Sequence, residues 1–133
     1  MMKKIIMTVI AVMVFSNMAM AMPQRAADGI VYWNGDTNYL IWDSGNHGGS
    51  CVDLSSAVMK IDNQSECLIA VLDYSVNYDK DTMSSKGVVQ FREDKRKGKL
   101  YFKVEGSKWG WQQFGFSSQP QVYYLVKSKL TQK

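Results

Sequence analysis

The fold of this chain is decided by residues 67–76, Cys67-Leu68-Ile69-Ala70-Val71-Leu72-Asp73-Tyr74-Ser75-Val76. No other stretch after residue 21 is as apolar. Near-continuous hydrophobicity over this length is typical of a strand that is covered on both faces, because a half-exposed strand alternates apolar and polar residues. We therefore expect residues 67–76 to form the central strand of a β-rich domain.

Further extended segments surround this strand in the sequence. Residues 30–33 and 39–42 are β-branched and aromatic, and they flank Asn34-Gly35, a pair that supports the positive φ angles of a tight hairpin turn. Residues 88–91 and 100–104 flank a charged segment and predict a second hairpin. Two polar stretches are expected to be loops, the glycine-rich residues 44–50 and residues 79–86.

The C-terminal residues differ in character from the strands. Pro120 suits the first turn of a helix, and Val122 and Val126 recur at helical spacing. The spacing predicts a helix over residues 120–130, although residues 122–126 also fit a last strand. The expected fold class is α+β and β-rich: a single antiparallel, strongly twisted sheet of about five to seven strands, with a C-terminal helix and one disulfide.

Residues 1–21 have the composition of a signal peptide. Lys3 and Lys4 precede an uncharged apolar run, and Ala19-Met20-Ala21 gives the small-x-small pattern that a signal peptidase reads. The apolar run is well short of the roughly 20 residues that a membrane-spanning helix needs, so we expect no permanent membrane span. We expect residues 22–133 to form a single exported domain, located in the periplasm, on the cell surface or outside the cell.

The two cysteines are expected to pair. Cys51 and Cys67 are the only cysteines of the chain, and disulfides form and persist in the compartments that an exported protein reaches. A redox or metal-binding pair needs closer spacing or further ligands, and His47 is the only histidine available. The sequence therefore predicts a structural disulfide between Cys51 and Cys67.

Charge and motif content argue against several function classes. Removing Lys3 and Lys4 from the 16 basic residues leaves 14 against 12 acidic residues, a balance too weak to indicate a nucleic-acid partner. His47 has no recognised triad spacing around it, and nothing fixes two aspartates at the separation that glycoside cleavage requires. We therefore expect no catalytic residue, no metal and no cofactor, and we do not expect an enzyme.

Four tryptophans make the more serious candidate for a binding surface. Exposed aromatic side chains stack against sugar rings or anchor protein interfaces, although aromatic residues also fill cores. We expect at least half of the tryptophans to lie in the core, and Trp109 and Trp111 to share a face because they have the same parity. The candidate binding surface comprises Trp33, Trp42, His47, Trp109 and Trp111.

The run Cys51-Val52-Asp53-Leu54-Ser55-Ser56, followed by the apolar strand, two further strands and a late Trp109, resembles small secreted bacterial domains of the surface-adhesin protein E type. That family often shows an aromatic-aromatic-Asp-x-x-Ser motif at this place. Asp53 and Ser56 fit the motif, while Cys51-Val52 replace the aromatic residues. The resemblance implies a compact antiparallel sheet with a helix, exposed at the cell envelope, that binds host or matrix proteins without catalysis.

The function expected from the sequence is an adhesin-like protein interaction by a non-catalytic, secreted or envelope-associated protein. Its partner is expected to be a protein or a glycan at the cell envelope or outside the cell. Two alternatives stay open. One is a periplasmic inhibitor of a cell-wall hydrolase that inserts residues 44–50, and the other is a carbohydrate-binding module that uses exposed tryptophans.

Overall fold

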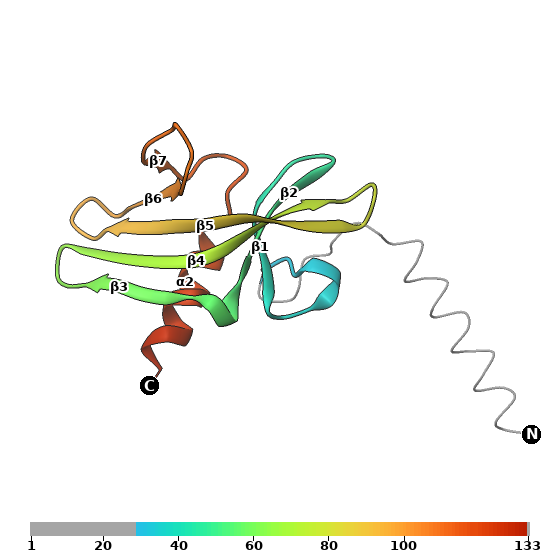
Figure 1. Ribbon diagram of the computed structural model, residues 1–133. Coiled ribbons are helices and arrows are strands. Elements are labelled where there is room, and N and C mark those ends of the chain that lie inside the picture. The colour runs from blue at the N-terminus through green and yellow to red at the C-terminus, as the bar shows by residue number, and fades with distance from the viewer. Residues whose placement is uncertain (1–28, 133) are drawn as a thin grey trace, which may run out of the picture.

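The structure is a computed structural model that describes residues 29–132. The predicted signal peptide lies outside the described residues. The described part of the chain folds into strands, two short 3₁₀ helices and one α-helix (Figure 1), which are η1 (Trp33–Gly35), β1 (Tyr39–Ser44), β2 (Gly48–Asp53), η2 (Leu54–Ser56), β3 (Val58–Asp62), β4 (Glu66–Asn77), β5 (Thr82–Asp94), β6 (Lys99–Val104), β7 (Gln112–Gln113) and α2 (Pro120–Thr131).

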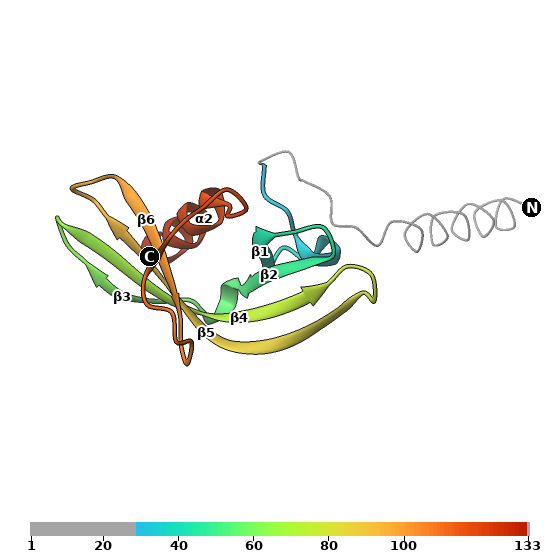
Figure 2. The ribbon, with the colours of Figure 1, turned by 90° about the horizontal axis from the view of Figure 1, so that it is seen from above.

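The strands form one antiparallel sheet in the order β1-β2-β4-β5-β6-β7, and β3 pairs with β4 on the same side as β2. The central strand is β4, because it pairs along its whole length with β5 while its two halves pair with β3 and β2. The sheet is curled, and α2 lies against one of its faces (Figure 2). The predictions of the central strand, the antiparallel β-rich fold and the C-terminal helix are confirmed, and the strand alternative for residues 122–126 is wrong.

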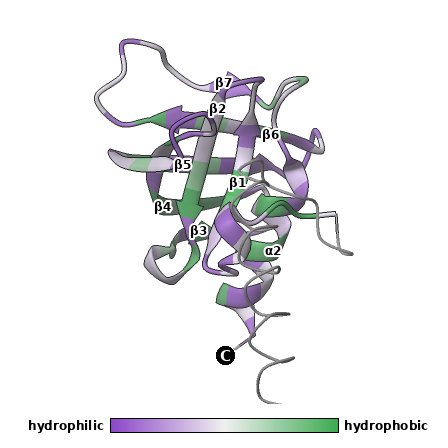
Figure 3. Cartoon of the chain, turned by 90° about the vertical axis from the view of Figure 1, so that its right-hand side faces the viewer, coloured by the Kyte–Doolittle hydropathy of each residue, from purple (hydrophilic) through white to green (hydrophobic). Residues whose placement is uncertain are grey.

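Two cores lie on opposite faces of the sheet. The larger core lies between the sheet and α2, and β4 contributes Ile69 and Val71 to it. The smaller core includes Trp33 of η1, and β4 contributes Val76 to it. Because residues of opposite parity point to opposite faces of a strand, β4 is buried on one face in its first half and on the other face in its second half. The prediction that this strand is covered on both faces is therefore wrong, because each half is buried on one face only and Leu72 is 38% exposed. The hydrophobic residues of the chain are green in Figure 3.

The predicted N-terminal hairpin is only partly present. Asn34 and Gly35 have the expected positive φ angles of 50° and 74°. Residues 30–33 nevertheless form no strand, and an isolated bridge joins Tyr32 to Leu40. The physical reason is that Trp33 turns into the smaller core, where its ring stacks on Tyr78 at a centroid distance of 6.2 Å, so the backbone curls into η1 at this point.

The two predicted loops are shorter than expected, because β2 begins at Gly48 and β5 begins at Thr82. The glycines of β2 belong to the sheet since neighbouring backbone approaches them closely. A Cβ atom on Gly48 would collide with the carbonyl oxygen of Val76, and one on Gly49 would collide with that of Asp43. Glycine in this segment therefore marks a close approach of strands and not only a turn.

The predicted Cys51–Cys67 disulfide is wrong, since both cysteines are free and fully buried. Cys51 pairs in register with Tyr74 of β4. Tyr74 and Cys67 are seven positions apart on that strand, a separation of about 23 Å. A disulfide requires Cα atoms within about 7 Å. The two thiols also belong to different cores, on opposite faces of the sheet.

Among residues 29–132, no helix has both the length and the hydrophobicity that crossing a membrane requires.

Candidate binding surface

The structure separates the five residues of the predicted binding surface. Trp33 and Trp42 are buried, each in a different core, so half of the tryptophans are core residues as expected. Trp109 and Trp111 are 62% and 42% exposed. His47 lies at the tip of the β1–β2 hairpin. Only Trp109 and Trp111 are therefore both exposed and close in the sequence. They lie outside strands, so the parity argument for a shared face does not apply to them.

His47 contacts one acidic side chain at the tip of its hairpin. Its Nδ1 atom lies 2.9 Å from Oδ2 of Asp79, and both side chains are largely exposed. Within residues 29–132, no group of three or more histidine, cysteine, aspartate or glutamate side chains is close enough to hold a metal ion. The pair joins the tips of two neighbouring hairpins, since the backbone N–H of Tyr78 also donates to the carbonyl of His47 at 2.9 Å.

The most exposed aromatic side chains lie on the connection between β6 and α2. We call residues 106–118 the aromatic loop. It includes the short strand β7 and is drawn in orange in Figure 1. The loop exposes Phe116 completely, at 108% of the reference area, in addition to Trp109 and Trp111. Phe116 was not among the residues predicted for the binding surface, whose aromatic members were all tryptophans. The signal was the glycine-interrupted repeat of aromatic residues, which continues through Phe114-Gly115-Phe116.

The base of the aromatic loop is anchored in the larger core. The Phe114 ring packs at centroid distances of 5.5 to 5.9 Å against Phe91, Trp42 and Phe102. The Ser117 hydroxyl donates to Asp43 at 2.5 Å, and Asp43 also forms a bridge with Ser118. These contacts hold the end of the loop against β1.

The glycines of the loop, in contrast, have open space around them. Apart from the adjacent residues of the chain, a Cβ atom added to Gly106, Gly110 or Gly115 would meet no atom within 4 Å. The exposed aromatic side chains are therefore presented on a segment whose base is fixed by packing and hydrogen bonds.

The charge of the aromatic loop is positive and small. Residues 106–119 contain no acidic residue, and Lys108 is the only charged side chain among them. The Lys108 ammonium lies 5.4 Å from the centroid of the Trp109 ring, a cation–π distance. The loop therefore combines a large apolar area with one cation that is not opposed by a neighbouring acid in the loop.

A buried carboxylate, Asp73, lies in the middle of β4. Asp73 is fully buried; its Oδ1 accepts a hydrogen bond from Nε1 of Trp42 at 3.0 Å, and its Oδ2 lies 3.8 Å from Nζ of Lys86. Lys86 is the extra residue of a β-bulge next to Gly87, whose φ of 104° suits glycine. Burial raises the pKa of Asp73, while the Trp42 hydrogen bond and the Lys86 charge oppose that rise.

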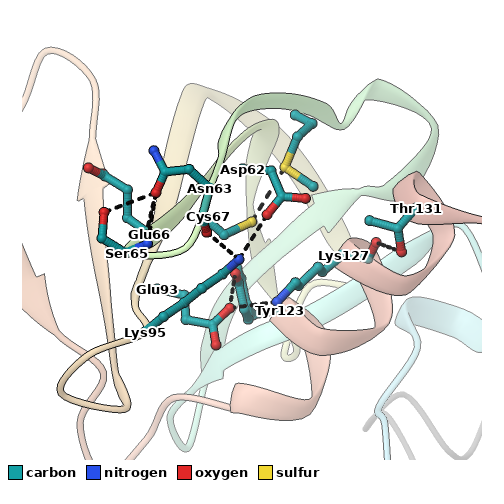
Figure 4. A network of polar contacts seen from close by, with 11 residues as sticks. Asp62, Asn63, Ser65, Glu66, Cys67, Glu93, Lys95, Tyr123, Lys127 and Thr131 are labelled. Atoms are coloured by element: carbon teal, nitrogen blue, oxygen red, sulfur yellow. Dashed lines mark hydrogen bonds and ion pairs between the residues drawn. The ribbon is translucent and has the colours of Figure 1, made fainter.

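A second polar network attaches α2 to the sheet (Figure 4). Glu93 of β5 accepts hydrogen bonds at 2.8 Å from the Tyr123 hydroxyl and from the Lys127 ammonium. Burial acts to raise the pKa of Glu93, but the hydrogen bonds from Lys127 and Tyr123 hold it below its usual value. Cys67 lies beneath this network and is fully buried. Because its members bond to one another, the network fixes the helix and does not open a site for a ligand.

The sheet face opposite α2 offers a shallow groove of about 230 Å³. Val58 and Leu72 are exposed on it, at 52% and 38%. This face is therefore a second exposed apolar area, lined by residues outside the aromatic loop.

Comparison with known proteins yields no relative. No protein-family model matches the chain, and neither a curated protein nor a solved structure matches it. The resemblance to surface-adhesin protein E type domains therefore stays a prediction.

Proposed function

We propose that this chain is an exported, non-catalytic binding protein of the cell envelope, adhesin-like in attaching to its target through an exposed surface. The observation that carries the proposal is the aromatic loop, which exposes Trp109, Trp111 and Phe116 within eight residues. Large aromatic side chains are the commonest anchors of binding interfaces. Exposed apolar groups that are gathered on one segment mark interaction sites in soluble domains.

The construction of the loop supports this proposal. Its base is fixed by Phe114 in the core and by the contact of Ser117 with Asp43. A fixed base limits the conformational entropy that is lost when the aromatic side chains bind. The loop therefore has the rigid attachment and the apolar tip that binding needs.

A carbohydrate-binding module is the second candidate. Trp109 and Trp111 are both exposed, and the exposed Gln112 and Gln113 follow them directly. Indole rings stack on sugar rings, and primary amides both donate to and accept from sugar hydroxyls. The hydrolase-inhibitor alternative receives less support, because the loop expected over residues 44–50 is reduced to a turn of residues 45–47.

Retention of the labelled protein on isolated cell-envelope fractions tests the proposal. We expect saturable binding by the wild type and its loss in the triple variant W109S/W111S/F116S. The matched control is V58S/L72S, which removes exposed apolar groups from the groove and should bind as the wild type does. Competition by free envelope oligosaccharides would identify the second candidate. Equal retention of the wild type and the triple variant would refute the proposal.

A further inference from the structure

We propose that the aromatic loop binds by inserting its apolar side chains into the interfacial layer of a lipid bilayer that carries anionic headgroups. The inference rests on the proposed function, because it names the target of the same loop. It concerns peripheral binding and requires no membrane-spanning segment.

The first argument comes from the exposure of the loop. Phe116 is fully exposed, and Trp109 and Trp111 are 62% and 42% exposed. Each of the three side chains therefore leaves aromatic surface open to a partner. A protein partner would need a pocket that matches three separate side chains, whereas the fluid interface of a bilayer accepts exposed apolar side chains without a preformed shape.

The second argument comes from the residue types. Tryptophan is enriched at the boundary between lipid and water, where its amphipathic ring lies at the level of the headgroups. Trp109 and Trp111 lie outside helices and strands, and the backbone N–H of Trp109 donates to the Ser107 hydroxyl. Such backbone is excluded from the hydrocarbon layer but is compatible with the interface. Shallow insertion, to about 5–10 Å, is therefore the depth that fits the loop.

The third argument comes from charge. Residues 106–119 contain no acidic residue, and their one charged side chain is Lys108, whereas Lys127 in the following helix is already paired with Glu93. Lys108 lies over the Trp109 ring, which places a cation beside an inserting aromatic group. Basic residues next to inserted aromatic groups are attracted by anionic lipids. This complementarity selects a negatively charged bilayer over a neutral one.

Binding to vesicles tests the inference. The purified protein would be mixed with vesicles of phosphatidylcholine and phosphatidylglycerol, and separately with vesicles of pure phosphatidylcholine, and bound protein would be measured by cosedimentation. We expect binding to the anionic vesicles with a blue shift of tryptophan emission, because Trp109 and Trp111 leave water while Trp33 and Trp42 are already buried.

Variants identify the groups responsible. W109S/W111S/F116S should lose more than about a hundredfold in affinity, since each large apolar side chain contributes at least several-fold. Lys108→Glu should lower the affinity for anionic vesicles by about 25-fold, since it changes the charge by two units and each unit near such a surface is worth roughly fivefold. V58S/L72S should bind as the wild type does.

The outcomes separate this inference from the proposed function. Absence of vesicle binding, together with loop-dependent retention on envelope fractions that is abolished by protease treatment of those fractions, would overturn the lipid target and leave the binding function intact. Equal binding to neutral and anionic vesicles would overturn the role of charge. Loop-independent retention on the envelope fractions would instead refute the proposed function.

Discussion

Replacement of Lys86 by methionine is expected to destabilise the protein by leaving a buried charge without its counter-ion. The Asp73 side chain is fully buried, and the Lys86 ammonium, at 3.8 Å, is the cation that faces it. The other groups that act on the carboxylate are Trp42, which donates to Oδ1, the backbone N–H of Tyr74, and Asp43, whose charge is unfavourable. Oδ2 has no hydrogen-bond partner among the described residues. Methionine retains most of the lysine stem and removes the charge.

The size of the effect follows from the geometry. Removing one member of a fully buried ion pair costs about 3–5 kcal/mol. Lys86 is 38% exposed and lies 3.8 Å from the carboxylate, so solvent screens part of this interaction and we expect about 2 kcal/mol. For a domain of this size, that loss lowers the melting temperature by about 10 °C.

The pH dependence gives the prediction its sign. The pKa of Asp73 is raised in the folded protein, so the native state holds a proton that the unfolded state has already lost. Stability therefore falls as the pH rises from the unfolded pKa, about 3.9, through the folded pKa. The Lys86 charge lowers the pKa of Asp73 in the folded protein. Lys86→Met therefore raises that pKa further and extends the pH range over which stability falls. Its deficit should be smallest below about pH 4, where Asp73 is protonated in both states, and should grow toward neutral pH.

Urea unfolding of four proteins would measure the effect: the wild type, K86M, D73N and the double variant. D73N keeps an oxygen acceptor for Trp42 and removes the charge. In the D73N background, K86M should cost no more than about 0.5 kcal/mol, because the charge that it leaves unpaired is gone. A K86M deficit that is independent of pH, or that persists in full with Asn at position 73, would refute the reasoning.

Three further predictions concern other parts of the fold. Native protein should resist iodoacetamide at both thiols and react after unfolding, since both side chains are fully buried and burial raises the pKa of Cys51 to about 12; an intact mass that corresponds to a disulfide would contradict this. Glu93→Gln should lower stability by about 1–2 kcal/mol at neutral pH, and in urea melts the loss should shrink as the pH falls through the depressed pKa of Glu93. Gly49→Ala should destabilise by more than about 2 kcal/mol because of its collision with backbone, whereas Gly110→Ala, which meets no atom, should leave the melting temperature unchanged.

The sequence predicted the centre of the sheet because burial leaves a direct trace in composition. Residues 67–76 are apolar at nearly every position, and β4 covers them. The same composition did not reveal that the two cores use opposite faces of β4. That division depends on where α2 and η1 return to the sheet, and hydrophobicity alone does not specify which element covers a strand.

The disulfide prediction failed for a related reason. It depended on the compartment and on an even cysteine count, and both are independent of geometry. The pairing register places Cys51 opposite Tyr74, far along β4 from Cys67. Each thiol instead contacts a methionine sulfur, Met83 for Cys51 at 3.7 Å and Met59 for Cys67 at 3.4 Å. These cysteines therefore behave as small core residues, a role common for buried free cysteine.

The candidate surface was predictable only in part, because residue type does not determine exposure. Trp42 is buried against Phe91 and Phe102, and Trp33 against Tyr78, while Trp109 and Trp111 are exposed. Whether a tryptophan is buried or exposed depends on contacts with residues far away in the sequence, which a short window of sequence does not contain. The repeat of glycine and aromatic residues was the better local signal, since it extends over the whole aromatic loop.

The contrast between Phe114 and Phe116 shows why the exposed aromatic groups call for a functional explanation. The two residues flank Gly115. Phe114 nevertheless packs into the larger core, whereas Phe116 is fully exposed. Packing accounts for Phe114, which contacts three core rings. It does not account for Phe116, because an exposed phenylalanine gains no burial and increases the risk of aggregation. A surface role for this side chain, together with Trp109 and Trp111, supplies the advantage that the fold itself does not.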